Sequence, residues 1–176
     1  MKIILFILSF FCLSFSPLSG IYDIQVQTLE GTNFSFGAAQ GKKILIAEFN
    51  GTAPDNDFLL LLESIQKTSK TTKIIAVPAT DFGSTIQTQN LVQLKTNLKL
   101  SFIITQPLAI KKDKGATQNS LFKWLTNVAN GNGHFNEEVL NDNQMYFVSE
   151  SGLMYALAGK GTQKNLVMEL LNRTVN

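Results

Sequence analysis

Apolar residues along the chain follow two periods, which divide it into strands and helices. Residues 43–49 and 73–77 are almost continuous apolar runs, typical of strands buried on both faces of a sheet, and Pro78 marks the expected end of the second run. Between them, apolar residues recur at helical spacing, and Asp55 or Asp57 is placed to cap the helix. The apolar positions of this helix are Phe58, Leu61, Leu62 and Ile65. A strand, a helix and a second strand in this order predict a parallel pair with a helical crossover.

Short alternating segments near both ends of the chain predict two hairpins. Residues 21–26 and 33–36 flank the turn signal at 30–32. Residues 144–149 and 153–157 flank a second turn that contains glycine. In sequence order, one predicted antiparallel hairpin therefore precedes the parallel pair of strands and the other follows it.

Three further helices and a short strand complete the predicted order of elements. Residues 88–98 have the period of a helix, and residues 102–104 form a short apolar stretch. Asn119 or Ser120 can cap a third helix, and Thr162 can cap the last one. With 44% hydrophobic residues, the chain has enough apolar material for one domain. We therefore expect an α/β fold with a central mixed sheet and helices on both faces.

The first twenty residues have the pattern of a secretory signal peptide. Residues 3–15 are a largely apolar run that follows a lysine, and residues 16–20 are small or turn-forming. The run is shorter than the roughly 20 residues that a membrane-spanning helix needs. We expect residues 1–20 to be removed and residues 21–176 to form the exported domain, either secreted or periplasmic. An uncleaved membrane anchor is the alternative.

The composition excludes several classes of site. Cys12 is the only cysteine and lies in the signal segment, so the exported chain would have no thiol, no disulfide and no cysteine-bound metal. Acylation of Cys12 is disfavoured because bulky residues precede it. His134 is the only histidine, and one histidine is a poor start for a metal site. Arg173 is the only arginine and the net charge is +2, which argues against nucleic-acid binding. We predict no cofactor and no metal.

Four segments resemble a known family in order and spacing. They are residues 21–23 with Gly31 and 41–46, residues 76–83, residues 121–125, and residues 147–152. On these segments the chain is similar to the glutathione peroxidase family, a branch of the thioredoxin superfamily, over essentially all of residues 21–176. The resemblance implies a thioredoxin-like fold with a central mixed β-sheet, helices on both faces and an N-terminal β-hairpin.

The catalytic positions of the resembled family are occupied by other residue types in this chain. The peroxidatic cysteine or selenocysteine falls on Thr52, or on Ala53 if the turn is aligned differently. The family's glutamine falls on Asp81, and its tryptophan and asparagine fall near Asn141 and Asp142. A threonine hydroxyl has no oxidation state equivalent to sulfenic acid, and it stays protonated without an adjacent base. Direct thiol peroxidase chemistry is therefore excluded for the exported chain.

Thr52 and Asp81 each follow a core strand, so they could meet at the carboxyl edge of the sheet as a small polar site. The simpler interpretation is that Thr52, Asp55 and Asp57 are turn and cap residues. The leading hypothesis is a non-catalytic binding or structural module with an unknown protein or small-molecule partner. The alternative is a residual role in peroxide reduction or oxidative stress, for example through a partner's thiol. A third hypothesis is an extracytoplasmic assembly or chaperone-like subunit.

Overall fold

The computed structural model describes residues 20–83, 85–130 and 135–175. The expected signal segment up to residue 19, with Cys12, lies outside these ranges, and so does His134. In the described part of the chain, no helix has the length and apolar character needed to cross a membrane.

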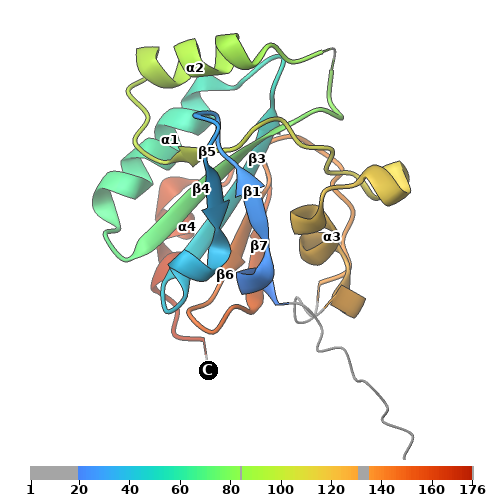
Figure 1. Cartoon of the computed structure of the whole chain (residues 1–176). Helices are drawn as coiled ribbons and strands as arrows, with labels where there is room; N and C mark the ends of the chain where they lie inside the picture. Colours follow the sequence, from blue (N-terminus) through green and yellow to red (C-terminus); the bar gives the residue numbers. More distant parts are fainter. Residues whose placement is uncertain (1–19, 84, 131–134, 176) are drawn as a thin grey trace, which may run out of the picture.

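The centre of the molecule is a five-stranded mixed sheet with the strand order β5-β4-β3-β6-β7 (Figure 1). β3, β4 and β5 are parallel to one another. β6 runs antiparallel to β3, and β7, which is antiparallel to β6, has the same direction as β3. The predicted parallel crossover and the late hairpin are thus confirmed. The bounds are β3 Lys43–Asn50, β4 Thr72–Ala79, β5 Ile103–Ile104, β6 Met145–Val148 and β7 Met154–Ala158.

Helices cover both faces of the sheet, as the element order predicts. α1, α2 and α4 contribute to the core on one face, and α3 packs on the other, as Figure 1 shows. The N-terminal hairpin forms a separate two-stranded sheet. The bounds are β1 Gln25–Gln27, β2 Asn33–Ser35, α1 Asn56–Thr68, α2 Thr88–Asn97, α3 Ser120–Thr126 and α4 Lys164–Asn172, with 3-10 turns η1 Ile21–Asp23, η2 Phe36–Ala39, η3 Lys112–Thr117 and η4 Val128–Asn130.

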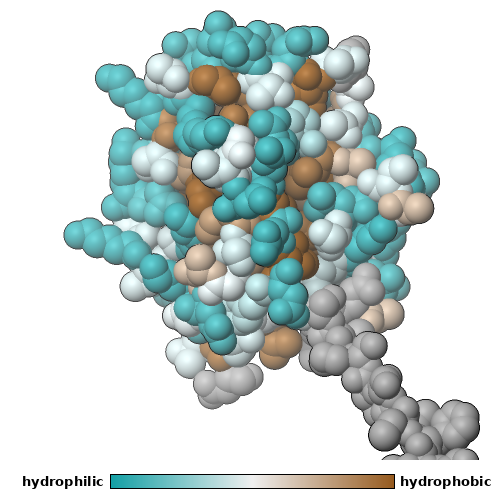
Figure 2. Space-filling view, in the orientation of Figure 1, coloured by the Kyte–Doolittle hydropathy of each residue, from teal (hydrophilic) through white to brown (hydrophobic). Residues whose placement is uncertain are grey.

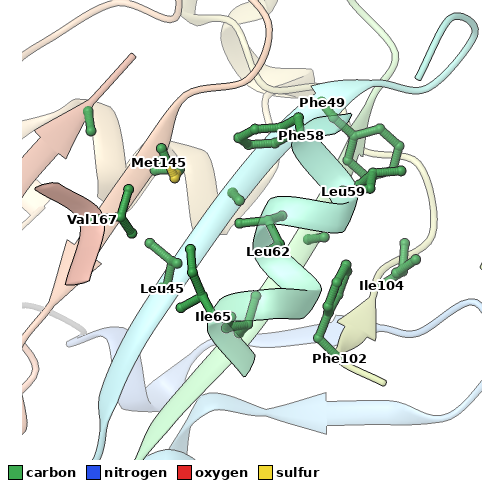
Figure 3. Packing of buried hydrophobic residues seen from close by; sticks show 14 of the residues in the cluster. Leu45, Phe49, Phe58, Leu59, Leu62, Ile65, Phe102, Ile104, Met145 and Val167 are labelled. Atoms are coloured by element: carbon green, nitrogen blue, oxygen red, sulfur yellow. The ribbon is translucent and has the colours of Figure 1, made fainter. Parts of the chain in front are cut away.

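Strand β3 supplies alternate residues to two hydrophobic cores. Leu45 and Phe49 point to the face covered by α1, whereas Ile44 and Ile46 belong to the core under α3, and all four are fully buried. Figure 3 shows the α1 side chains lying over β3. Because burial of one such side chain contributes roughly 1.5–3 kcal/mol, β3 is held from both faces. The α1 residues of this core are Phe58, Leu59, Leu62 and Ile65.

Two of the predicted element ends are wrong. β4 does not end at Pro78, which pairs with Phe49 inside the sheet; its carbonyl accepts a hydrogen bond from Leu108 N at 2.9 Å, so proline loses only its donor. Thr162 is not the cap of α4, because its hydroxyl donates to the Gly159 carbonyl at 2.7 Å. Gln163 occupies the cap position of α4 and makes no side-chain cap bond.

Lys43, at the start of β3, holds the end of α4. Its ammonium donates to the carbonyl oxygens of Leu171, at 2.7 Å, and Arg173, and it lies 5.7 Å from the centre of the Tyr155 ring. Its residue is only 9% exposed. The Lys43 side chain therefore connects the start of the central strand β3 to the C-terminal end of α4.

Lys43→Met is expected to lower the free energy of unfolding by about 2 kcal/mol, because hydrogen bonds from a charged group are lost and buried carbonyls are left without a donor. Urea unfolding followed by circular dichroism would measure the change. Lys42→Met is the matched control, since Lys42 is exposed. Equal stabilities of the two variants would contradict this role for Lys43.

The outer surface is mixed in character. On the face shown in Figure 2, hydrophilic residues dominate, and hydrophobic residues are visible between them in a central band. The most exposed large apolar residues of the described chain are separated along the sequence: Leu60, Val92, Val128, Leu140, Leu153 and Leu166.

Candidate functional site at the carboxyl edge of the sheet

The turn after β3 is organised by the side chain of Asn50. Its Oδ1 accepts hydrogen bonds from Thr52 N at 3.0 Å, from the Thr52 hydroxyl at 2.8 Å and from Ala53 N at 3.2 Å. Its Nδ2 donates to the Phe82 carbonyl at 3.2 Å and so joins this turn to the loop after β4. The two backbone N–H groups are thus used within the turn, and they are not free to stabilise a reacting group.

Thr52, or Ala53 in the other alignment of the turn, is the residue that the family resemblance predicts at the position of the reactive chalcogen. Thr52 is exposed, and its hydroxyl donates to the amide oxygen of Asn50. An amide oxygen is too weak a base to remove the hydroxyl proton, so this contact does not activate Thr52 as a nucleophile. The interaction has the form of an Asx turn, in which an asparagine oxygen accepts from the residues that follow it.

The side chains of Thr52 and Asp81 are engaged in different contacts. Asp81 Oδ2 accepts from Ile110 N at 2.5 Å and from Lys111 N at 3.3 Å, and Lys114 lies 3.9 Å from its other oxygen. The Asp81 side chain is 2% exposed. It therefore holds the segment before η3, and no described hydrogen bond links it to Thr52.

The loops that carry these residues nevertheless touch. A Cβ added to Gly83 would lie 2.1 Å from Thr52 Oγ1, which shows how closely the 81–83 loop approaches the turn after β3. The expectation that the two loops converge at the carboxyl edge is correct. The expectation of a joint polar site made by Thr52 and Asp81 has no support in their contacts.

Gly83→Ala is expected to destabilise the protein by about 1–3 kcal/mol, because the new methyl group overlaps the Thr52 hydroxyl. The same substitution in a Thr52→Ala background should cost less, since the overlapping oxygen is then absent. Urea unfolding of the wild type, both single variants and the double variant gives a double-mutant cycle, which measures the interaction between the two residues. Additive changes in the free energy of unfolding would show that the two residues do not meet.

In the loop before β6, the buried polar residue is Asn143, which lies next to the candidate positions Asn141 and Asp142. Asn141 is exposed, and Asp142 pairs with Lys160 at 3.3 Å. Asn143 is 1% exposed, and its Nδ2 donates at 3.2 Å to Oδ2 of Asp55, the N-cap residue of α1. Its φ of 66° lies in the left-handed region, which asparagine tolerates better than most residues. Asn143 thus joins this loop to α1, and the left-handed preference of asparagine was the available signal.

Glu48, inside β3, is a buried acid that the sequence pattern did not single out. Its residue is 0% exposed, Oε1 accepts from Gln144 N at 2.8 Å, and Oε2 has no partner among the described residues. Burial raises the pKa of Glu48 to about 8. The charge of Asp142 also raises this pKa, while the N–H groups of Gln144 and Asn143 and the charge of Lys111 lower it. A single glutamate within an apolar run is the sequence signal by which Glu48 could have been found.

An open groove lies beside the turn after β3 and has a volume of about 590 Å³. The side chain of Ile86 covers Gly51, where an added Cβ would lie 2.2 Å from Ile86 Cδ1. None of the described residues that line the groove is charged. The lining residues are Gly51, Thr52, Pro54, Thr85, Ile86, Gln87, Asn90, Leu91 and Leu94.

No group of three or more His, Cys, Asp or Glu side chains within the described ranges could hold a metal ion. The side chains at the carboxyl edge can form hydrogen bonds and apolar contacts, but those described there include no sulfur and no imidazole.

No protein-family model and no curated protein sequence matches the chain. Solved structures do. The glutathione peroxidase Trgpx in apo form gives a TM-score of 0.67 at 16% identity, over 87% of this chain and 93% of the other. T. cruzi GPX1 gives 0.63 at 16% identity, over 87% and 94%. A secreted Mycobacterium tuberculosis disulfide oxidoreductase homologous to E. coli DsbE gives 0.58 at 13% identity, over 85% and 95%.

The protein has a thioredoxin-like fold. The expected central mixed sheet, the helices on its faces and the N-terminal hairpin are confirmed with it. At these identities the similarity establishes the fold alone, and glutathione peroxidases and disulfide oxidoreductases both share it. Within this thioredoxin-like chain, the turn after β3 contains Thr52 and Ala53, the two residues that the resemblance offers for the position of the reactive atom.

Proposed function

We propose that this protein is an exported, glutathione-peroxidase-like member of the thioredoxin fold that lacks peroxidase chemistry of its own and acts as a non-catalytic binding module. The observation that carries the proposal is the self-contained turn after β3. The hydroxyl of Thr52 donates to Asn50 at 2.8 Å, and the adjacent N–H groups bond to the same oxygen. A site that reduces peroxide needs a sulfur or selenium atom whose deprotonated form is favoured, and this turn provides neither.

The groove beside the turn supports a binding role. Its apolar part is made by Pro54, Ile86, Leu91 and Leu94, and its polar part by uncharged hydroxyl and amide side chains. Small-molecule and peptide sites commonly combine an apolar lining with a few polar groups that fix orientation. We propose an uncharged ligand or an extended peptide segment as the occupant.

Peroxide reduction is the direct test of the missing chemistry. Protein without residues 1–20, mixed with hydrogen peroxide and either glutathione or reduced thioredoxin, should show no turnover above buffer. Turnover above about 1 per second, an ordinary though low enzymatic rate, would overturn the non-catalytic proposal. Mass spectrometry of the exported protein would test separately whether residues 1–20 are removed.

Binding in the groove can be tested with a pair of variants on one helix. Asn90 lines the groove and is exposed, whereas the exposed Gln93 on the same helix does not line it. NMR amide titration with a mixture of short uncharged peptides should shift groove residues in the wild type. Asn90→Trp should abolish these shifts by filling the groove, and Gln93→Trp should preserve them. Shifts that survive in Asn90→Trp would place the ligand elsewhere.

A further inference from the structure

The two edges of the central sheet are protected to different degrees. At the β5 edge, the N-terminal hairpin supplies backbone partners: Leu29 N donates to Ile104 O at 2.9 Å, and Gln106 N donates to Gln27 O at 2.8 Å. At the other edge, β7 pairs with β6 on one side only. Among the described residues, no backbone hydrogen bond reaches β7 from any segment other than β6.

β7 also lacks the residues that usually keep an edge strand from pairing. Residues 154–158 have the sequence Met-Tyr-Ala-Leu-Ala, with no charge and no proline, and Leu153 just before them is 47% exposed. Edge strands are normally blunted by lysine, proline or a covering segment, because their free N–H and C=O groups invite another strand. The β-bulge near Phe147 and Val148 is the one irregularity in its pairing with β6.

We propose that β7 is a docking strand for a second copy of this chain, joined antiparallel about a two-fold axis near Ala156. A row of unpaired backbone donors and acceptors is complementary only to another strand, and a strand of this composition is complementary to itself. Two-fold pairing uses the same patch on both copies, which is the commonest arrangement of soluble dimers. The two five-stranded sheets then form one continuous sheet.

The charges next to β7 favour this arrangement over a parallel one. Glu150 lies before the strand and Lys160 after it, with side chains 51% and 56% exposed. Antiparallel pairing about Ala156 places the turn that carries Lys160 of one copy at the end of the strand pair where the other copy has the turn that carries Glu150. Opposite charges at cross-strand or diagonal positions are attractive, and the two-fold axis creates this pair twice.

The test is the mass of the processed protein in solution. Edge pairing over one short strand buries less than a standard interface, so we expect a weak dimer that forms at about 100 µM and dissociates at about 1 µM. Sedimentation velocity over this range should show the mass double. Amide exchange of residues 154–158 should slow at high concentration. A mass that stays monomeric throughout, even if β7 captures added peptides, overturns the proposal.

A charge exchange identifies the interface. Lys160→Glu should weaken dimerisation at least about tenfold, because two acidic residues then meet at each end of the pair. Glu150→Lys combined with Lys160→Glu should restore it. Asp142→Asn is the matched control, since it breaks the Lys160 to Asp142 ion pair without changing the charges beside β7. Dimerisation that Lys160→Glu leaves unchanged, or that the exchange fails to restore, assigns the contact to another surface.

Discussion

Glu48→Gln is expected to make the protein more stable than the wild type at pH 8 by several kcal/mol, and to change stability little at pH 4.5. Burial raises the pKa of Glu48 from 4.5 to about 8 in the folded protein. A difference of this size corresponds to a free energy of up to about 5 kcal/mol. Glutamine has nearly the same shape as the protonated acid and does not ionise.

The direction follows from which state binds the proton. Between pH 4.5 and about 8, the unfolded chain has lost the Glu48 proton and the folded chain has kept it. Folding in this window therefore takes up a proton, so the contribution of Glu48 to stability is complete below pH 4.5 and falls as the pH rises. It reaches its lowest value above about pH 8, where the buried acid is ionised in both states.

Glu30 and Glu63 contribute to stability with the opposite pH dependence. Their contributions cancel when the variant is compared with the wild type. A hydrogen bond from Lys95 lowers the pKa of Glu30. Burial raises the pKa of Glu63, but hydrogen bonds from Ser101 and Lys67 outweigh it and give a net lowering. Both acids stabilise the fold above their unfolded pKa and lose this contribution as the pH falls. They are present in wild type and variant alike, so the difference between the two proteins reports on Glu48.

Urea unfolding at several values between pH 4.5 and pH 8.5 measures the effect of Glu48→Gln. Glu137→Gln is the control, because Glu137 is exposed. A difference between Glu48→Gln and wild type that does not change with pH would show that the buried acid does not hold its proton. A variant less stable than wild type at pH 8 would show that the carboxyl group contributes a contact that glutamine cannot replace.

Local sequence patterns correctly predicted the strands and the helix that carry the turn after β3. The apolar runs at residues 43–49 and 73–77 indicated the two central strands, because a strand buried on both faces has no polar side to show. The sequence offered Asp55 or Asp57 as the cap of α1, and Asp55 is the cap: it accepts from Asp57 N at 3.1 Å and Phe58 N at 3.2 Å. These features depend on neighbours within a few residues.

The arrangement of side chains at the site depends on distant segments, and the sequence pattern did not reveal it. From the sequence, Asp81 and Thr52 could have met in a small polar site, but the backbone N–H groups of Ile110 and Lys111, about thirty residues later, hold the Asp81 carboxylate. Asn143 reaches Asp55 across the chain. A residue's type shows what bonds it can form, whereas only the tertiary fold determines which partner lies within reach.

Thr52→Cys should convert an inert turn into one that hydrogen peroxide oxidises stoichiometrically, without making the protein a peroxidase. With residues 1–20 removed, as proposed, the wild-type chain has no thiol to react, so the appearance of a sulfenic acid is a change from none to one equivalent. The new thiol would lie beside Asn50 Oδ1, an acceptor that favours the protonated form. Asp55 and Asp57 are near in sequence, and their negative charges would disfavour a thiolate.

Thr80→Cys supplies the comparison, because Thr80 is exposed just after the next core strand. Trapping the sulfenic acid with dimedone and measuring mass should give oxidation rates for the two variants within about tenfold of each other, since neither thiol is activated. Neither variant should turn over with glutathione. If Thr52→Cys alone reacts a thousandfold faster than a free thiol, or sustains turnover above about 1 per second, the turn has retained the means to activate a sulfur. In that case Asn50 and its neighbours would be remnants of a catalytic site that lacks only the reacting atom, and the binding role of the groove would need separate support.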